Sequence, residues 1–247
     1  MSGIAYLVGA GPGGADLITV RGLALLRSAD AVVYDHLVDP SLLDEAPPGA
    51  ELVYVGKEAG AHTVPQQTIN EILVERVRRG GRVVRLKGGD PYVLGRGGEE
   101  ALALIDSGLA FEVVPGVTSA IAVPGSAGIP VTHRGLAGGF AVMSGRTRTG
   151  QVVDRLEVGR YARVPTLVIL MAHAAVGPLM GMLIEAGRDE GEPAAAISRG
   201  ATADERVVVG TVGTLADLVA AADLGRPVTL VVGEVVGMRA RIAAAGG

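Results

Sequence analysis

The sequence predicts an α/β protein, and three observations support this class. Short apolar runs typical of strands alternate with segments of helical periodicity along the 247 residues. Hydrophobic residues make up 49% of the chain and charged residues 19%, which is typical of a globular protein with a sizeable core. The 38 glycines gather in clusters at the ends of several apolar runs, and this placement favours loops built around a ligand.

The first half of the chain alternates regularly between the two kinds of segment. Strands are expected at 4–9, 31–35, 51–56, 82–89 and 111–116, and helices near 20–28, 66–79 and 97–107. Thr19 is the expected N-cap of the first helix, because its hydroxyl can accept a hydrogen bond from an N–H of the first turn.

The second half has a different pattern. Strands are expected at 139–145, 166–171, 194–200, 205–211 and 228–236, and the paired runs AAAIS and RVVVG favour antiparallel neighbours. A segment rich in Pro and Gly separates the halves, so we expect a domain 1–115 and a domain 116–247. A cleft between two domains is the default place for a small ligand.

Composition excludes several classes of function. The chain has no cysteine, and its four histidines show no metal-ligand spacing, so neither disulfides nor a metal site is expected. A net charge of −4 offers no broad basic surface for nucleic acid. Residues 165–184 carry no charge, but Pro165 and Pro178 favour a buried strand, a turn and a helix over a membrane span. Without a signal peptide pattern, a cytoplasmic protein is expected.

The stretch GAGPGG at 9–14 satisfies G-x-G-x-x-G, and Asp35 follows at about the distance of a dinucleotide fingerprint. In that fold a helix begins inside the motif and points at the pyrophosphate. Here Pro12 is followed by two glycines, each costing about 1 kcal/mol in a helix relative to alanine. The residues therefore disfavour a dinucleotide site, and a glycine turn without a ligand is the second alternative.

A second glycine cluster, LKGGDP, ends another predicted strand. Asp90 in it could accept hydrogen bonds from an amine or hydroxyl of a ligand, or it could cap a helix after Pro91. Arg85 and Lys87 are two apart and so face one side of a strand. Together with arginines in glycine-rich loops, they indicate a polyanionic small molecule, unless they are ordinary surface residues.

One ordered set of motifs carries a resemblance: LVGAGPGGADLIT, VVYDHLV, VGKEAGAHTVPQQTIN, VVRLKGGDPYVLGRGGEE, EVVPGVTSA and AGIPVTHRG. The set resembles the uroporphyrinogen-III C-methyltransferases of the tetrapyrrole methylase superfamily, over nearly the whole chain and most densely at 4–135. The resemblance implies a two-domain tetrapyrrole methylase fold, of class III among the S-adenosylmethionine-dependent methyltransferases. The cofactor and active site would lie in the interdomain cleft. A precorrin methylase, diphthine synthase or rRNA methylase of the same superfamily is the alternative.

The resemblance also implies a reaction. S-adenosylmethionine would methylate uroporphyrinogen III at C2 and C7, giving precorrin-2 through precorrin-1 for cobalamin or sirohaem, with S-adenosylhomocysteine as product and no metal. Without the dehydrogenase and chelatase domain of some relatives, the reaction would stop at precorrin-2. The family resemblance implies a homodimer. The stretches PLMGMLI and VTLVVGEVVGM favour it too, because they hold more apolar surface than one small domain should bury.

By resemblance, Asp35 is the proton acceptor and Lys57 the proton donor. The residues implied at the cofactor are Pro12, Gly88, Gly89, Asp90, Val93, Thr118, Ser119, Met171 and Gly200, and those implied at the substrate are Arg96 and Arg134. The sequence departs from the family pattern at Gly14, Leu94, Leu170 and Ala172, which we expect to change the cofactor and substrate walls.

Overall fold

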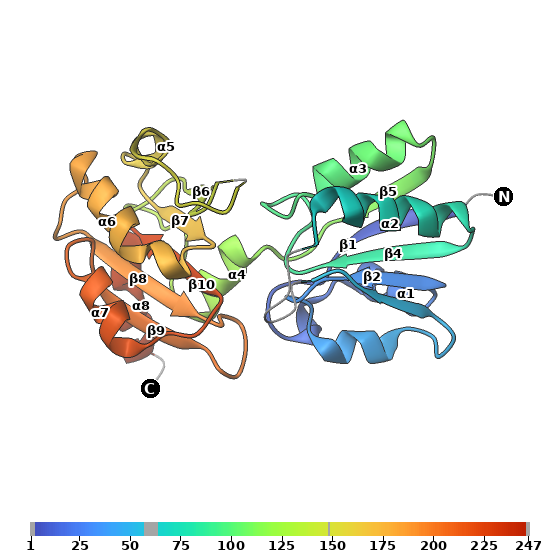
Figure 1. Cartoon of the computed structure of the whole chain (residues 1–247). Helices are drawn as coiled ribbons and strands as arrows, with labels where there is room; N and C mark the ends of the chain where they lie inside the picture. The colour runs from blue at the N-terminus through green and yellow to red at the C-terminus, as the bar shows by residue number, and fades with distance from the viewer. Residues whose placement is uncertain (1–2, 57–63, 148, 246–247) are drawn as a thin grey trace. The chain divides into compact units, whose positions relative to one another are not determined.

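The computed structural model of the chain describes residues 3–56, 64–147 and 149–245 (Figure 1). It divides into two compact units, unit 1 from Met1 to Thr118 and unit 2 from Ser119 to Gly247. Each unit contains a five-stranded sheet of its own, with helices packed on it. This is the two-domain α/β architecture that the sequence predicts.

Unit 1 is built on an all-parallel sheet with strand order β3-β2-β4-β1-β5. Its strands are β1 (Ile4–Gly9), β2 (Ala31–Tyr34), β3 (Glu51–Tyr54), β4 (Arg82–Lys87) and β5 (Ala110–Val114). Its helices are α1 (Val20–Leu26), α2 (Gln66–Arg78) and α3 (Gly97–Asp106). Because the strands are parallel, their carboxyl ends meet at one edge of the sheet, where ligands bind in open α/β sheets.

Helices cover both faces of this sheet (Figure 1). Leu7 of β1 packs in a cluster with Leu73 of α2 and Leu104 of α3, while its neighbour Val8 packs on the other face with Leu26 of α1. Successive strand residues point to opposite faces, so burial on both sides requires a nearly continuous apolar strand. This explains the apolar runs of β1 and β2, whereas β4 also carries the charged residues Arg85 and Lys87.

The connection from β1 to α1 is a loop with one short 3₁₀ turn, Ala15–Leu17. Thr19 caps α1 as predicted, since its Oγ1 accepts a hydrogen bond from the Gly22 N–H at 3.1 Å. No helix begins within residues 9–14, all of which are described, so this loop lacks the geometry of a dinucleotide fingerprint.

Unit 2 contains a mixed sheet with strand order β6-β7-β10-β8-β9. Its strands are β6 (Ala141–Ser144), β7 (Leu167–Leu170), β8 (Pro193–Ser198), β9 (Arg206–Thr211) and β10 (Val228–Val232). Its helices are α4 (Ser119–Ser126), α5 (Arg155–Tyr161), α6 (Val176–Glu185), α7 (Leu215–Ala222) and α8 (Met238–Ala245). The predicted antiparallel pairing of 194–200 with 205–211 is confirmed by β8 and β9.

The strand expected at 228–236 is shorter than predicted. Gly233 has a φ of +144°, a conformation that L side chains rarely adopt, and a Cβ there would contact the Pro165 carbonyl. The chain leaves the sheet at this glycine and forms a 3₁₀ turn at Glu234–Gly237.

The two apolar stretches that suggested a dimer belong to the core of unit 2. In α6 the side chains of Leu179, Met180 and Leu183 are buried, and every residue of β10 is buried. The expectation that these stretches hold more apolar surface than one domain can bury is therefore wrong. Within the described residues, no helix is both long and apolar enough to cross a membrane.

Two glycines, Gly9 and Gly116, allow the loops at the carboxyl edge of unit 1 to touch. A Cβ on Gly9 would lie 2.5 Å from the Gly116 Cα and 2.6 Å from the Gly89 carbonyl oxygen. Real Cβ atoms essentially never approach backbone so closely. The loops after β1, β4 and β5 can therefore pack together only while these positions lack side chains.

We predict that Gly9→Ala destabilises the chain by about 1–3 kcal/mol, since backbone must move to admit the methyl group. Gly98→Ala is the matched control: Gly98 lies in α3 with open space where its Cβ would stand, so alanine should be neutral or stabilise by up to about 1 kcal/mol. Urea unfolding of both variants measures the difference. Equal stabilities would show that the loops can separate without cost.

Candidate functional site

The carboxyl edge of the unit 1 sheet gathers most of the predicted site residues. Pro12 follows β1, Asp35 follows β2 and Gly88–Asp90 follow β4. Val93 and Arg96 continue the loop that leads to α3, and Thr118 lies beyond β5. Ser119, Arg134, Met171 and Gly200 belong to unit 2, and Lys57 lies outside the described residues.

Asp35 presents a carboxylate that is fixed at both oxygens and remains accessible. Its Oδ1 accepts a hydrogen bond from the Leu37 N–H at 3.1 Å, and its Oδ2 accepts one from Arg85 Nη2 at 3.4 Å. The side chain of Asp35 is 27% exposed, whereas that of Arg85 is 3% exposed. The carboxylate thus lies at the boundary between the core of unit 1 and its surface.

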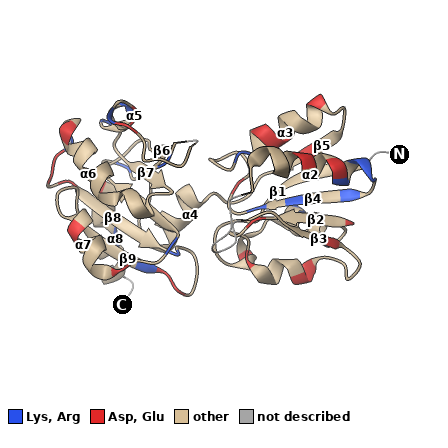
Figure 2. Cartoon of the chain, viewed as in Figure 1, with Lys and Arg blue, Asp and Glu red and all other residues tan. Residues whose placement is uncertain are grey.

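Behind Asp35 lies a buried group of charges on β4 and α3. The Glu100 side chain is fully buried, and its Oε1 accepts hydrogen bonds from Arg85 Nε at 2.9 Å and Lys87 Nζ at 3.0 Å. Gln66 Nε2 lies 3.4 Å from the same oxygen. The other oxygen, Oε2, is buried without a hydrogen-bond partner among the described residues. Figure 2 shows the basic residues along β4 and acidic residues on α2 and α3.

These contacts change the interpretation of Arg85 and Lys87. The two side chains do share one face of β4, as the spacing predicts, but α3 covers that face and both side chains form ion pairs with Glu100. They are therefore internal residues and not a surface for a polyanion. Sequence reasoning missed Glu100, although its place on the buried face of α3 with Gly97, Ala101 and Leu104 was a usable signal.

Asp90 ties two loops together. Its Oδ1 accepts a hydrogen bond from the Tyr92 N–H at 2.8 Å, and its Oδ2 accepts one from the Gly116 N–H at 2.9 Å. The alternative that it caps a helix after Pro91 is wrong, because α3 begins only at Gly97. Gly11 and Gly89 exchange two backbone hydrogen bonds, of 3.2 and 2.8 Å, which join the loop after β1 to the loop after β4.

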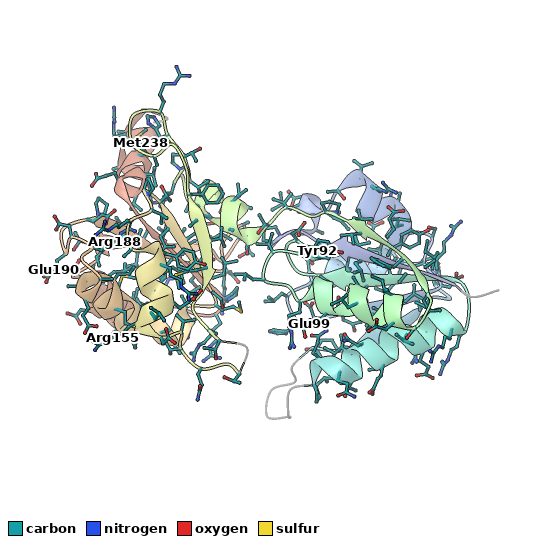
Figure 3. All side chains as sticks on the ribbon, turned by 90° about the horizontal axis from the view of Figure 1, so that it is seen from above. Tyr92, Glu99, Arg155, Arg188, Glu190 and Met238 are labelled. Carbon is teal, nitrogen blue, oxygen red and sulfur yellow. The ribbon has the colours of Figure 1, made fainter. Side chains whose placement is uncertain are left out.

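Apolar side chains lie exposed directly beyond this joined pair of loops. Tyr92, Val93 and Leu94 are 55%, 36% and 43% exposed. Figure 3 labels Tyr92 on this loop and Glu99 on α3. Exposed apolar side chains beside the glycine loops offer contacts to a partly apolar ligand.

Arg96 is engaged within unit 1. Its Nε and Nη2 donate to the two carboxylate oxygens of Glu99, each at 2.8 Å. The hydrogen bond to Glu99 raises the pKa of Arg96 above its ordinary value. A carboxylate ligand of Arg96 would therefore share the guanidinium with Glu99.

The predicted residues of unit 2 lie on four different segments, and Ser119 is the first residue of α4. Met171 follows β7 with a φ of +58° and is 49% exposed, and Arg134 is exposed on a loop. A Cβ on Gly200 would lie 2.9 Å from the Val123 Cβ, so packing against α4 requires glycine there. A polar cavity of about 260 Å³ in this unit contains none of the predicted residues; Ser198, Arg199, Asp204, Arg206, Asp223 and Gly225 line it.

Among the described residues, no group of three or more His, Asp or Glu side chains is placed to hold a metal ion. At the unit 1 edge, the described residues include the accessible Asp35 carboxylate, glycine-rich backbone and exposed apolar side chains.

Lys87 makes stability depend on pH. Burial lowers the pKa of Lys87 below its ordinary 10.5, and the positive charge of Arg85 lowers it further against the pull of Glu100. Between the lowered pKa and 10.5 the unfolded chain binds more protons than the folded chain. The contribution of Lys87 to the free energy of unfolding therefore increases as the pH rises through that window. It is lost again as the pH falls from 10.5 through the pKa of the folded state.

We predict that the unfolding free energy of wild type rises relative to that of Lys87→Met as the pH is raised toward 10.5. Titrating groups away from Lys87 are common to both proteins and cancel in the difference. Urea unfolding at a series of pH values measures it, and a difference that does not vary with pH would contradict the burial argument.

Comparison with known proteins extends the description of the site. Residues 5–216 match the family of Tetrapyrrole (Corrin/Porphyrin) Methylases. The chain is 45% identical to the uroporphyrinogen-III C-methyltransferase of Priestia megaterium, over 95% of this chain and 98% of that protein. It is also 45% identical to the enzyme of that name from Methanocaldococcus jannaschii, over 96% and 98%.

A solved structure agrees with these matches. The uroporphyrin-III C-methyl transferase of Thermus thermophilus, complexed with S-adenyl homocysteine, is 43% identical and superposes with a TM-score of 0.83, over 95% of this chain and 99% of that chain. Sequence and structure thus agree, and the chain belongs to the tetrapyrrole methylase family.

Proposed function

We propose that the chain catalyses the S-adenosylmethionine-dependent methylation of uroporphyrinogen III at C2 and C7, giving precorrin-2 through precorrin-1. The observation that carries the proposal is the Asp35 carboxylate, accessible and fixed at both oxygens, at the sheet edge that holds the glycine loops. Two relatives of 45% identity carry the name of this activity, which supports the choice of substrate.

The residues of the unit 1 edge fit S-adenosylmethionine. Gly11, Gly13 and Gly89 adopt positive φ, so backbone without side chains faces the space beyond the strands. Val93 and Leu94 offer exposed apolar surface for an adenosyl group. Pro12, Gly88, Gly89, Asp90, Val93 and Thr118 of unit 1, with Ser119, Met171 and Gly200 of unit 2, are the residues we propose bind it. When bound, S-adenosylmethionine supplies an electrophilic methyl group and leaves as S-adenosylhomocysteine.

The chain's own task is orientation and proton removal. Pyrrole carbons are electron-rich and can attack the methyl carbon in line, so holding the two reactants in register supplies much of the rate. Methylation of a substituted ring carbon leaves the macrocycle with a positive charge, which it loses by releasing a proton from another of its atoms. We assign that proton to an oxygen of Asp35, whose position is fixed by the Leu37 N–H and by Arg85.

Further roles stay predictions from the family resemblance. Lys57 is the proposed proton donor. Arg96 and Arg134 are the proposed partners of substrate carboxylates, with the charge of Arg96 shared with Glu99 and that of Arg134 exposed. A homodimer is proposed on the same ground, and a cytoplasmic location without nucleic acid or membrane partners is proposed from the sequence features described above.

The test of the reaction uses methyl-labelled S-adenosylmethionine and enzymatically made uroporphyrinogen III. We expect two labelled methyl groups per macrocycle, located at C2 and C7 by mass spectrometry and NMR. No transfer, or transfer only to a tetrapyrrole that is already methylated, would move the chain to another reaction of the family.

We predict that Asp35→Asn lowers kcat by a factor of about 10²–10⁴, the usual effect of removing a general base. Affinity for S-adenosylmethionine, measured by calorimetry, should stay unchanged because asparagine keeps the size and one acceptor oxygen of the side chain. If Asp35→Asn turns over at the wild-type rate, the proton leaves by another route.

A further inference from the structure

We propose that Arg85 is a positioning residue, which fixes the Asp35 carboxylate for proton transfer and is itself fixed by the buried carboxylate of Glu100. The proposal rests on the assignment of Asp35 as proton acceptor. Arg85 is too deeply buried to touch substrate, so the buried charges of unit 1 would affect the reaction through the position of Asp35.

The guanidinium of Arg85 is oriented by three groups besides Asp35. Its Nε donates to Glu100 Oε1 at 2.9 Å, and its Nη1 donates to the carbonyl oxygens of Val33 at 3.3 Å and Leu86 at 3.0 Å. A guanidinium is planar and its N–H groups form a rigid fork, so these bonds also fix the direction of Nη2. The orientation of the remaining hydrogen bond, from Nη2 to Asp35 Oδ2, is therefore fixed as well.

The charges of the group balance only when Asp35 is included. Arg85 and Lys87 share the single negative charge of Glu100, so these three buried residues carry an excess of one positive charge. Asp35 supplies the second negative charge, and of the four residues it is the one with substantial exposure. Burying an uncompensated charge is costly, so the core favours a carboxylate held against Arg85.

The second contact of Asp35 completes the constraint. The Leu37 N–H holds Oδ1 from the loop after β2, while Arg85 holds Oδ2 from β4. A carboxylate held at both oxygens from different elements cannot rotate freely. Catalytic groups need such support, because a displacement of about 1 Å can cost on the order of 10²-fold in rate.

The chain provides a matched pair of variants. Arg85→Met and Lys87→Met each remove one buried positive charge and leave Glu100 with one cation, so the two variants are matched in net charge. Of the two side chains, Arg85 is the one with a hydrogen bond to Asp35. We expect Arg85→Met to lower kcat on the order of 10²-fold with little change in KM, and Lys87→Met to keep kcat close to wild type.

A double-mutant cycle separates positioning from general damage. If Arg85 acts through Asp35, then Arg85→Met should have little further effect on kcat in an Asp35→Asn background. Should Arg85→Met fail to fold, Arg85→Lys replaces it in the cycle, because lysine keeps the charge beside Glu100 but lacks the fork that also reaches Asp35.

The outcomes distinguish this proposal from the proposed function. Wild-type kcat in Asp35→Asn would remove the base and with it the ground for this inference. A slow Asp35→Asn beside a fast Arg85→Met would keep the base and overturn the positioning role. Equal losses of kcat in Arg85→Met and Lys87→Met, or full additivity in the cycle, would also overturn it, because the effect of Arg85 would then not depend on its hydrogen bond to Asp35.

Discussion

The buried carboxylate of Glu100 is the constraint on which the site in unit 1 depends. A charged group in a core is tolerated when opposite charges compensate it, and removing one partner of such a pair typically costs about 3–5 kcal/mol. Both compensating cations come from β4, which lies between β2 and β1 in the sheet. The position of α3 on the sheet is therefore tied to the register of β4, and through Arg85 to the carboxylate of Asp35.

The loop that joins β4 to α3 makes this arrangement possible. Leu94 and Arg96 adopt the left-handed conformation, and a Cβ on Gly97 would collide with the Pro91 carbonyl. The chain thus turns back tightly enough for Glu100 to reach Lys87, the last residue of β4. The same loop carries Asp90, whose carboxylate ties it to the segment after β5. The loop between β4 and α3 therefore positions both the buried charge of Glu100 and the backbone proposed to bind the ligand.

Sequence patterns predicted the elements well and the environment of side chains less well. The periodicity of apolar residues located β1 to β5 and α1 to α3, and the chemistry of Thr19 predicted its cap, because both signals are local. Spacing also placed Arg85 and Lys87 on one face of a strand. It could not predict whether that face is covered, which depends on where α3 packs, so their compensation by Glu100 required the structure. The end of β10 depended on Gly233 meeting Pro165, a contact between residues far apart in the chain.

The departures from the family pattern illustrate the same division between local and tertiary effects. They were expected to alter the walls of the site, yet Leu170 and Ala172 are buried on either side of the exposed Met171. Leu170 packs with Ala120 and Val168, while Ala172 packs in the larger core of unit 2. Substitutions at these two positions therefore repack the interior beneath Met171 and leave its exposed side chain in place. Leu94 is different, because it is exposed on the loop that carries Asp90, where a change of side chain alters the surface offered to a ligand. A difference between relatives in cofactor affinity should thus be sought first at position 94.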